Sequence, residues 1–375
     1  MSKKLILVIG ATGAQGLAVI DALLAPTDDG SPSPYAIRAL TRDPESRRAK
    51  ILTTKGVECV KGAFDDFPSV LHALQGAYGA FVNTDGLTVG EQKEVFSGIR
   101  IFELAKQVGS LKHYVWSNLE YVSKKTNFNP DYRCEHYDGK GRVAEFLKLY
   151  PSEPTDNGMS WSVLTTGPYM DMLKFVSLSH AVFMRIRANA TLQVMFGPLN
   201  KRKDGTVIFA TPVGNGHVPM IALSDLGFFA RYIFDHRVET SGQDLEVTSD
   251  VVGWDHLVST YQKVTGQKAV AVYQPLDEWF DNFDHVDLPV ASDLWNQGDP
   301  HATTWRKNFT AWWRLYRDDI LPRDLTWIRG LNPKGHTLES WMRENNYEGL
   351  SEDALLKNAE DGRMITPREE VVSKL

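Results

Sequence analysis

The chain has 375 residues, 42% of them hydrophobic and 23% charged, and its formal net charge is −6. This composition predicts a globular protein of two lobes, and its slightly acidic balance without a basic run argues against direct nucleic-acid binding. The chain shows no signal-peptide pattern and no apolar run that could span a membrane, so we expect a cytoplasmic protein. Two cysteines, Cys59 and Cys134, are too few for a disulfide framework or a metal cluster, and no metal is expected.

Up to about Pro168, short runs rich in β-branched and aromatic residues alternate with stretches of helical pattern. This alternation predicts an α/β fold: a Rossmann doubly wound parallel sheet, followed by a smaller, irregular α/β second lobe. The predicted strands are residues 5–9, 36–41, 57–61, 79–84, 113–117 and 160–165. Helices are predicted at residues 16–24, 68–74, 90–107 and 140–149.

We expect the Rossmann domain to occupy residues 1–168. Part of residues 221–275 is a candidate to pack back onto this domain. Residues 169–350 then form the second, substrate-side lobe, and residues 351–375 form a peripheral tail.

The second half of the chain holds two further helical signals. A helix is predicted over residues 223–234, with Ser224 as its N-cap and Asp225 in its first turn. The stretch 295–341 is rich in tryptophan, and we interpret it as packed helices rather than as an aromatic recognition surface, because tryptophan buries a large apolar area. These tryptophans are Trp305, Trp312, Trp313, Trp327 and Trp341.

Three glycines at the spacing G-x-x-G-x-x-G separate the first predicted strand from the first predicted helix. Gly10 allows a sharp exit from the strand, Gly13 lets the backbone approach a pyrophosphate, and Gly16 lets the helix pack closely on the sheet. The helix start offers N–H groups and the positive end of its dipole to phosphates. The predicted dinucleotide loop is therefore Gly10, Ala11, Thr12, Gly13, Ala14, Gln15 and Gly16.

The end of the second predicted strand indicates which dinucleotide is bound. A site that prefers NAD usually places Asp or Glu there, whereas this sequence has Thr41 followed by Arg42. A guanidinium can pair with the 2′-phosphate of NADP, and Thr41 can add a hydroxyl contact. We therefore predict NADP(H) rather than NAD(H). The alternative is a solvated surface arginine that Asp43 partly neutralises.

Two further loops follow predicted strands on the side where such sheets bind ligands. Ala63 and Phe64 follow the third strand, where the adenine is expected. Thr84, Asp85 and Gly86 follow the fourth strand, where the loop is expected to pass under the ribose and pyrophosphate. Position, not side-chain chemistry, makes these residues candidates.

Several segments carry a family pattern, namely residues 10–16, 40–44, 76–81, 136–141 (His-Tyr-Asp-Gly-Lys-Gly), 167–169 and 324–341. On these segments the chain resembles the NmrA-like family over about residues 3–345. This family is the atypical branch of the short-chain dehydrogenases that also includes isoflavone reductase-like enzymes. It contains fungal oxidoreductases and a human redox sensor.

The resemblance implies NADP contacts from the glycine loop, Arg42, the loop at Thr84 and Asp85, Lys140 and the loop that contains Tyr169. Two positions depart from the family pattern. Phe96 stands where the redox sensor has a lysine, and Ala63 stands where an acidic residue is usual. Only backbone contacts are expected at these two positions.

The pattern of candidate catalytic residues is unusual. An ordinary short-chain dehydrogenase uses Tyr-x-x-x-Lys beside a serine, and the tyrosine passes the proton. Here His136 occupies the tyrosine position before Lys140, and Tyr137 is one residue away, which on a helix turns it about 100° from the Lys140 face. Ser117 ends the fifth predicted strand, where the serine usually lies. Lys140, Ser117 and His136 are thus the candidates, with a purely cofactor-anchoring Lys140 and a structural His136 as alternatives.

Two functional classes remain open. The first, which we favour, is an NADP(H)-dependent NmrA-type oxidoreductase acting on a small carbonyl or enone of specialised metabolism, with Lys140 holding the ribose and relaying or supplying the proton. The second is a non-catalytic NADP(H)-binding redox sensor that acts through protein partners, for which a nuclear location is also open. Lys140, Ser117 and the aromatic second lobe favour catalysis, and we recognise no partner-binding motif.

Overall fold

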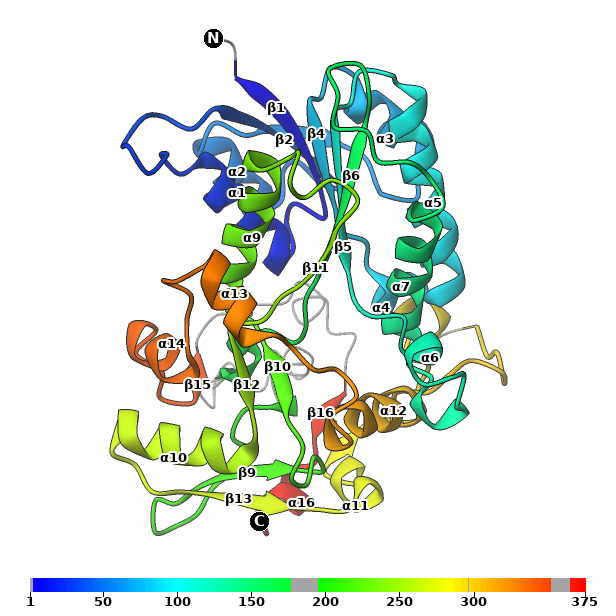
Figure 1. Cartoon of the computed structure of the whole chain (residues 1–375). Helices are drawn as coiled ribbons and strands as arrows, with labels where there is room; N and C mark the ends of the chain where they lie inside the picture. The colour runs from blue at the N-terminus through cyan, green and yellow to red at the C-terminus, as the bar shows by residue number, and fades with distance from the viewer. Residues whose placement is uncertain (1–2, 177–194, 296, 352–364) are drawn as a thin grey trace. The chain divides into compact units, whose positions relative to one another are not determined.

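The computed structural model describes residues 3–176, 195–295, 297–351 and 365–375, which form two compact units (Figure 1). The first unit consists of Met1–Tyr121, Glu135–Thr166 and Leu223–Val247. The second consists of Val122–Cys134, Gly167–Ala222 and Thr248–Leu375. Each unit is thus built from three separate stretches of sequence.

A seven-stranded parallel sheet forms the centre of the first unit, in the order β11-β6-β5-β4-β1-β2-β3. Its strands are β1 (Lys4–Ile9), β2 (Tyr35–Thr41), β3 (Glu58–Lys61), β4 (Gly79–Val82), β5 (His113–Asn118), β6 (Ser160–Thr165) and β11 (Asp244–Glu246). The predicted Rossmann sheet is confirmed, with one strand more than expected. That strand, β11, has only three residues at the sheet edge, too few to give a sequence pattern.

Helices cover both faces of this sheet, which explains why β4, β5 and β6 are buried along their whole length. In Figure 1, α1 and α9 lie side by side on one face, and α3, α5 and α7 lie on the other. The helices of the first unit are α1 (Ala14–Leu24), α2 (Arg47–Thr54), α3 (Phe67–Leu74), α4 (Gly86–Val89), α5 (Glu91–Gln107), α7 (Glu135–Leu147) and α9 (Leu223–Asp235).

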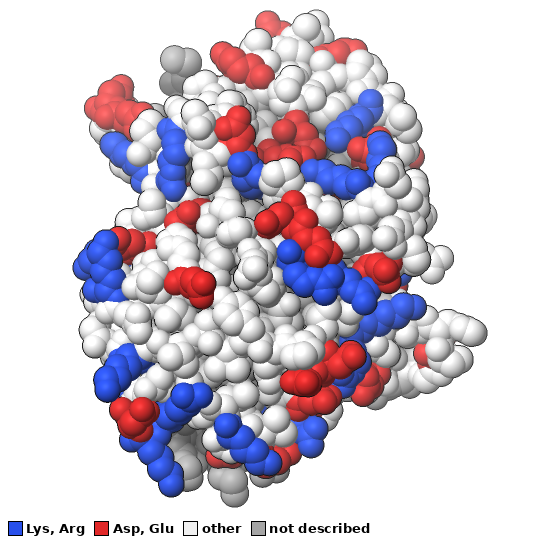
Figure 2. Space-filling model, turned by 60° about the horizontal axis from the view of Figure 1, so that its bottom comes forward, with Lys and Arg blue, Asp and Glu red and all other residues white. Residues whose placement is uncertain are grey.

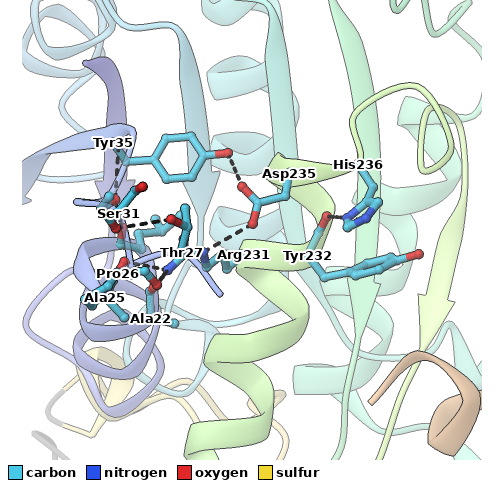
Figure 3. A network of polar contacts seen from close by, with 12 residues as sticks. Ala22, Ala25, Pro26, Thr27, Ser31, Tyr35, Arg231, Tyr232, Asp235 and His236 are labelled. Carbon is cyan, nitrogen blue, oxygen red and sulfur yellow. Dashed lines mark hydrogen bonds and ion pairs between the residues drawn. The ribbon is translucent and has the colours of Figure 1, made fainter. Parts of the chain in front are cut away.

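Helix α9 is far from α1 and β2 in the sequence, but polar contacts join it to both of them (Figure 3). The Arg231 guanidinium donates to the carbonyl oxygens of Ala22 and Ala25 at the C-terminus of α1, at 2.9 and 2.6 Å. Asp235 accepts from Arg231 at 3.2 Å and from the Tyr35 hydroxyl at 2.7 Å. Burial and the hydrogen bond to Asp235 raise the pKa of Tyr35, so its hydroxyl remains a donor.

The start of α7 and the N-cap of α9 differ from the sequence prediction. Helix α7 begins at Glu135 rather than at residue 140, because its two interior glycines, which weaken a helix pattern, are needed for packing. A Cβ at Gly141, for example, would overlap the backbone of Tyr121. Helix α9 begins at Leu223, so Ser224 lies inside the first turn and is not the N-cap, whereas Asp225 lies in the first turn as predicted.

The second unit contains small sheets and short helices. The strand β9 pairs in parallel with β13 and antiparallel with β8, and β10 pairs with β12. Its strands are β7 (Phe175–Val176), β8 (Asn200–Lys201), β9 (Val207–Thr211), β10 (Val218–Met220), β12 (Asp250–Val252), β13 (Ala269–Tyr273), β14 (Phe283–Asp284), β15 (Leu350–Ser351) and β16 (Thr366–Pro367). Its helices are α6 (Val122–Lys125), η1 (Pro130–Tyr132), η2 (Met170–Leu173), α10 (Trp254–Thr265), α11 (Leu276–Phe280), η4 (Ser292–Leu294), α12 (Trp305–Arg317), α13 (Leu325–Leu331), α14 (Leu338–Glu344) and α16 (Glu369–Val372).

The tryptophans of the second unit mostly form its core. Trp313 is fully buried and contacts Trp254 and Trp279 edge to face, with ring centroids 5.7 and 5.2 Å apart. Trp305, Trp312 and Trp341 are buried as well, whereas Trp327 is 42% exposed. Burial in a packed core is therefore confirmed for Trp305, Trp312, Trp313 and Trp341, but not for Trp327.

The predicted tail, residues 351–375, falls largely on residues 352–364, outside the described part of the chain. The described end returns to the second unit, where β16 pairs antiparallel with β14.

Charges of both signs are mixed on the face drawn in Figure 2, where Lys and Arg side chains lie among Asp and Glu side chains. Several charges of the second unit form ion pairs, as Arg314 does with Asp131 at 2.9 Å and Arg317 with Asp318 at 2.9 Å. Across the described residues, no helix is both long enough and apolar enough to cross a membrane.

Candidate cofactor site

The strand order of the first unit reverses between β1 and β4, which are neighbours although β2 and β3 separate them in sequence. In such sheets the ligand crevice lies beyond the carboxyl ends of the strands at this reversal. The two loops that leave these strands touch each other, because the Asn83 N–H donates to the Ile9 carbonyl oxygen at 3.2 Å. Gly10 has φ of +79°, and a Cβ there would lie 2.7 Å from the Asn83 carbonyl oxygen. The loop after β1 thus requires glycine at its first position.

The predicted glycine loop leads directly into α1. Gly13 is the N-cap, no side chain caps the helix, and its first turn contains no acidic residue. A Cβ at Gly16 would overlap the Gly10 carbonyl oxygen, so the helix approaches the strand as closely as predicted. Ala11, Thr12, Ala14 and Gln15 are buried within this turn.

One basic residue beside this loop was not predicted. Arg48 in the first turn of α2 is 8% exposed, and its guanidinium donates to the Thr12 carbonyl oxygen at 3.1 Å. The sequence offered no signal for it, because Arg48 is one of several cations between residues 42 and 50.

Lys140 lies under the loop after β4. Its ammonium group donates to the Thr84 carbonyl oxygen at 2.9 Å, to the Thr84 hydroxyl at 3.2 Å and to the Asn83 side chain at 3.3 Å. It also forms an ion pair with the Glu94 carboxylate at 3.0 Å, and it lies 5.4 Å from the centroid of the Trp116 ring. Lys140 and Thr84, both predicted site residues, are therefore brought together, and Glu94 is a third member that was not predicted.

Ser117 is held at the carboxyl end of β5. Its hydroxyl donates to the Gln15 side chain at 2.6 Å, so the fifth strand is linked to the start of α1. Next to it, the Trp116 indole N–H donates to the Lys140 carbonyl oxygen at 3.2 Å. Ser117, Gln15 and Lys140 thus belong to one connected region of the first unit.

His136 and Lys140 are four residues apart on α7 and therefore lie on the same face of that helix. His136 is half-buried, and its ring meets the Tyr137 ring edge-on at 5.1 Å. Tyr137 is 2% exposed. Tyr137 lies three residues before Lys140, and residues three apart are also neighbours on a helix, so helix geometry does not turn it away from Lys140, contrary to the prediction. Tyr137 differs from His136 in being buried.

Arg42 extends from the end of β2 into solvent. No hydrogen bond or ion pair with another described residue holds its guanidinium. Asp43 instead accepts from the Glu45 N–H at 2.9 Å, and the Thr41 hydroxyl contacts the backbone of Asp43 at 3.3 Å. Arg42 is therefore not neutralised by Asp43 in the structure.

The remaining candidates have structural contacts of their own. Asp85 caps α4 and accepts from the Thr88 hydroxyl at 2.7 Å. The Ala63 N–H donates to Ser69 at 3.3 Å, and the neighbouring Phe64 is half-buried. Tyr169 belongs to the second unit, where its backbone pairs with Ile221. Phe96, at the family lysine position, is 61% exposed and contacts Phe67 at 5.6 Å.

The geometry of the first unit fits a dinucleotide. It offers the hydrogen-bond donors and positive charges that phosphates and a ribose require. These come from a glycine turn without a Cβ, an uncapped helix start, an unpaired guanidinium at the end of β2 and a buried lysine under the β4 loop. The described residues contain no group of His, Cys, Asp and Glu side chains that could hold a metal ion.

The chain is similar to several known proteins. The NmrA-like family matches residues 2–297. The NmrA-like family domain-containing oxidoreductase malD of Malbranchea aurantiaca is 28% identical over 305 residues, which cover 77% of this chain and 78% of malD.

Among solved structures, NmrA, a negative transcriptional regulator, has a TM-score of 0.67 and 18% identity, covering 93% of this chain and 99% of NmrA. The NADPH-dependent quinone oxidoreductase QOR2 of Escherichia coli, solved with NADPH, has a TM-score of 0.62 and 17% identity, covering 91% and 100%. At these identities the solved structures establish a shared fold.

Proposed function

The chain belongs to the NmrA-like family, and from this premise we propose that it is an NADP(H)-dependent oxidoreductase that acts on a small carbonyl or enone. The observation that carries this proposal is the meeting of two loops at the reversal of strand order. One is the glycine loop after β1, and the other is the loop after β4 that Lys140 holds from below. The names of two similar proteins support the same class of enzyme: malD is named an oxidoreductase, and QOR2 is named an NADPH-dependent quinone oxidoreductase.

The residues of the first unit would bind NADP(H) as follows. The backbone from Gly10 to Gly16 would receive the pyrophosphate at the start of α1. Arg42, unpaired at the end of β2, would receive the 2′-phosphate, with Thr41 beside it, and this is the basis for NADP(H) rather than NAD(H). Lys140 and the Thr84 to Gly86 loop would hold the nicotinamide ribose.

The remaining contacts are assigned by position. Ala63 and Phe64 would line the adenine side through backbone and ring contacts, and Tyr169 is a candidate only through the family resemblance. These assignments follow the family resemblance and the ends of the strands.

Bound NADPH would supply the hydride at its nicotinamide ring. Lys140, held in place by its ion pair, would orient the ribose and relay or supply the proton for the substrate oxygen. Ser117, fixed by Gln15, and His136, on the same helix face as Lys140, would contact the substrate oxygen. In this arrangement the substrate is a small molecule.

A non-catalytic NADP(H) sensor is the second candidate, and one observation favours it. The tyrosine position of ordinary short-chain dehydrogenases holds His136 here, and the neighbouring Tyr137 is buried, so its phenol is not open to a substrate in this structure. NmrA, the regulator of similar fold, has been solved with NAD and with NADP. A sensor would act through protein partners.

Single-turnover oxidation of bound NADPH against a panel of carbonyl and enone compounds tests the proposal. We expect loss of NADPH absorbance with at least one compound, and we expect Lys140→Ala to abolish it. Lys148→Ala is the matched control, because Lys148 directly follows α7 but is 41% exposed and pairs with Glu145. Tight binding of NADPH without turnover would favour the sensor, and absence of NADPH binding would refute both functions.

A further inference from the structure

Glu94 of α5 is a completely buried carboxylate beside the loop after β4. Its Oε1 atom accepts from the Thr84 hydroxyl at 2.7 Å and pairs with the Lys140 ammonium at 3.0 Å. The Glu94 side chain is 0% exposed and that of Lys140 is 10% exposed. Both charges are therefore removed from water, and each depends on the other for compensation.

Two glycines make room for this carboxylate. A Cβ at Gly86 would overlap the Glu94 Oε2 atom, and a Cβ at Gly139 would lie 2.9 Å from it. The Oε2 atom has no hydrogen-bond partner among the described residues. A buried oxygen without a donor is costly, so the contacts of Oε1 must offset the burial of the whole group.

The contacts of Oε1 also orient their partners. The Thr84 hydroxyl donates its single hydrogen to Glu94, so toward Lys140, 3.2 Å away, it acts as an acceptor. Lys140 donates as well to the Thr84 carbonyl oxygen and to Asn83. Glu94 thus fixes the rotamer of Thr84 and the ammonium position together, and through them the path of the backbone after β4.

We propose that Glu94 is a positioning residue, which holds the Lys140 ammonium in place and keeps the loop at Asn83 and Thr84 ready for the cofactor. The inference rests on the proposed function, since it assigns Glu94 to the site where NADP(H) would bind. Glu94 itself lies behind Lys140 and Thr84 and acts through them.

Few other charged groups surround this pair. On α5, Glu91 pairs with the partly exposed Arg142 at 3.0 Å. On α7, Asp138 is buried, and Asp85 caps α4. Glu94 is the carboxylate in direct ion contact with Lys140.

The test compares Glu94→Gln, Glu94→Asp and the native chain by calorimetric titration with NADPH at neutral pH. Glu94→Gln preserves the shape but removes the charge, so we expect NADPH affinity to fall about tenfold or more. Glu94→Asp retains a negative charge that can pair with Lys140, so we expect it to recover part of the lost affinity.

Glu91→Gln is the matched control, because it removes a carboxylate one turn earlier on α5 whose partner Arg142 is 41% exposed. Its NADPH affinity should equal that of the native chain. Thermal unfolding without cofactor gives a second readout. Glu94→Gln and Lys140→Met should each lower the Tm, and the double variant should recover most of the loss, because it leaves no buried charge unpaired.

The outcomes separate this inference from the proposed function. If the native chain binds NADPH and Glu94→Gln binds it equally well, the positioning role is wrong while the cofactor site stands. If the native chain does not bind NADPH, the proposed function fails and the role of Glu94 at a cofactor site fails with it. If Glu94→Gln does not fold, Glu94→Asp and the double variant provide the comparison, and a double variant that also fails to fold would show that the defect is not caused by an unpaired Lys140. If all variants fold, additive Tm losses would show that the two residues are not coupled.

Discussion

Arg42 is the residue on which the choice of dinucleotide depends. Its guanidinium is exposed at the end of β2 and has no partner among the described residues. We expect Arg42→Ala to weaken NADP binding by at least about 1.5 kcal/mol, the loss of a charge-assisted hydrogen bond, and to leave NAD binding nearly unchanged. Calorimetric titration with both dinucleotides measures the difference.

The control for Arg42 is Lys50→Ala. Lys50 lies in α2, is 64% exposed and pairs with Glu45 at 3.3 Å, so its removal should affect neither dinucleotide. Equal losses of NADP and NAD affinity in Arg42→Ala would refute the role of Arg42 in recognising the 2′-phosphate.

Residues differ in how far the sequence alone reveals them. Gly10, Gly13 and Gly16 could be predicted because their spacing between a strand and a helix has a local cause in backbone geometry. Glu94 could not, because its partner Lys140 belongs to another helix and only the folded sheet brings α5 and α7 together. Arg48 was missed for the same reason, since its contact with Thr12 joins α2 to the loop after β1.

At the scale of elements, α7 shows where a local pattern fails. Its two interior glycines lower helix propensity, yet tertiary contacts require them at these positions, since a Cβ at Gly141 would overlap Tyr121 and one at Gly139 would crowd Glu94. The pattern therefore predicted a later start than Glu135. The correct start matters for the site, because it places His136 and Lys140 on one helical face.

The attachment of α9 to α1 yields a prediction at the same scale. Arg231→Met would leave the carbonyl oxygens of Ala22 and Ala25 without their guanidinium donor and Asp235 without its cation. Since the Arg231 side chain is 14% exposed, we expect a loss of roughly 2 kcal/mol in the free energy of unfolding. Urea denaturation followed by circular dichroism measures this loss.

Arg100→Met on α5 is the control for Arg231. Arg100 pairs with Glu103 at 2.9 Å, but both side chains are more than 40% exposed, so the change should stay within about 0.5 kcal/mol. A similar small change in Arg231→Met would mean that the contacts of Figure 3 contribute little to holding α9.

At the scale of the whole molecule, the sheet of the first unit was predictable and the second unit was only partly so. Strands buried on both faces give short apolar runs between helices, and that alternation identifies a doubly wound sheet. The second unit has strands of two to five residues, which are too short for a clear period. Its tryptophans indicated a packed core, but no local pattern shows that Trp254 and Trp279 meet Trp313.

The family resemblance inferred from short motifs is confirmed by the match over residues 2–297. The chemistry is less constrained than the fold, because solved proteins of this fold include both a transcriptional regulator and an NADPH-dependent reductase. The described side chains that bear on this choice are Lys140, Ser117 and His136, and their roles remain proposals.

Hydrogen–deuterium exchange of the native chain, with and without saturating NADPH, tests most directly whether the loops after β1 and β4 form the cofactor site. Our account predicts slower exchange at the backbone amides of residues 10–16 and 83–86, because these two loops would enclose the pyrophosphate and ribose. Unchanged exchange in both loops, or protection confined to the second unit, would contradict it.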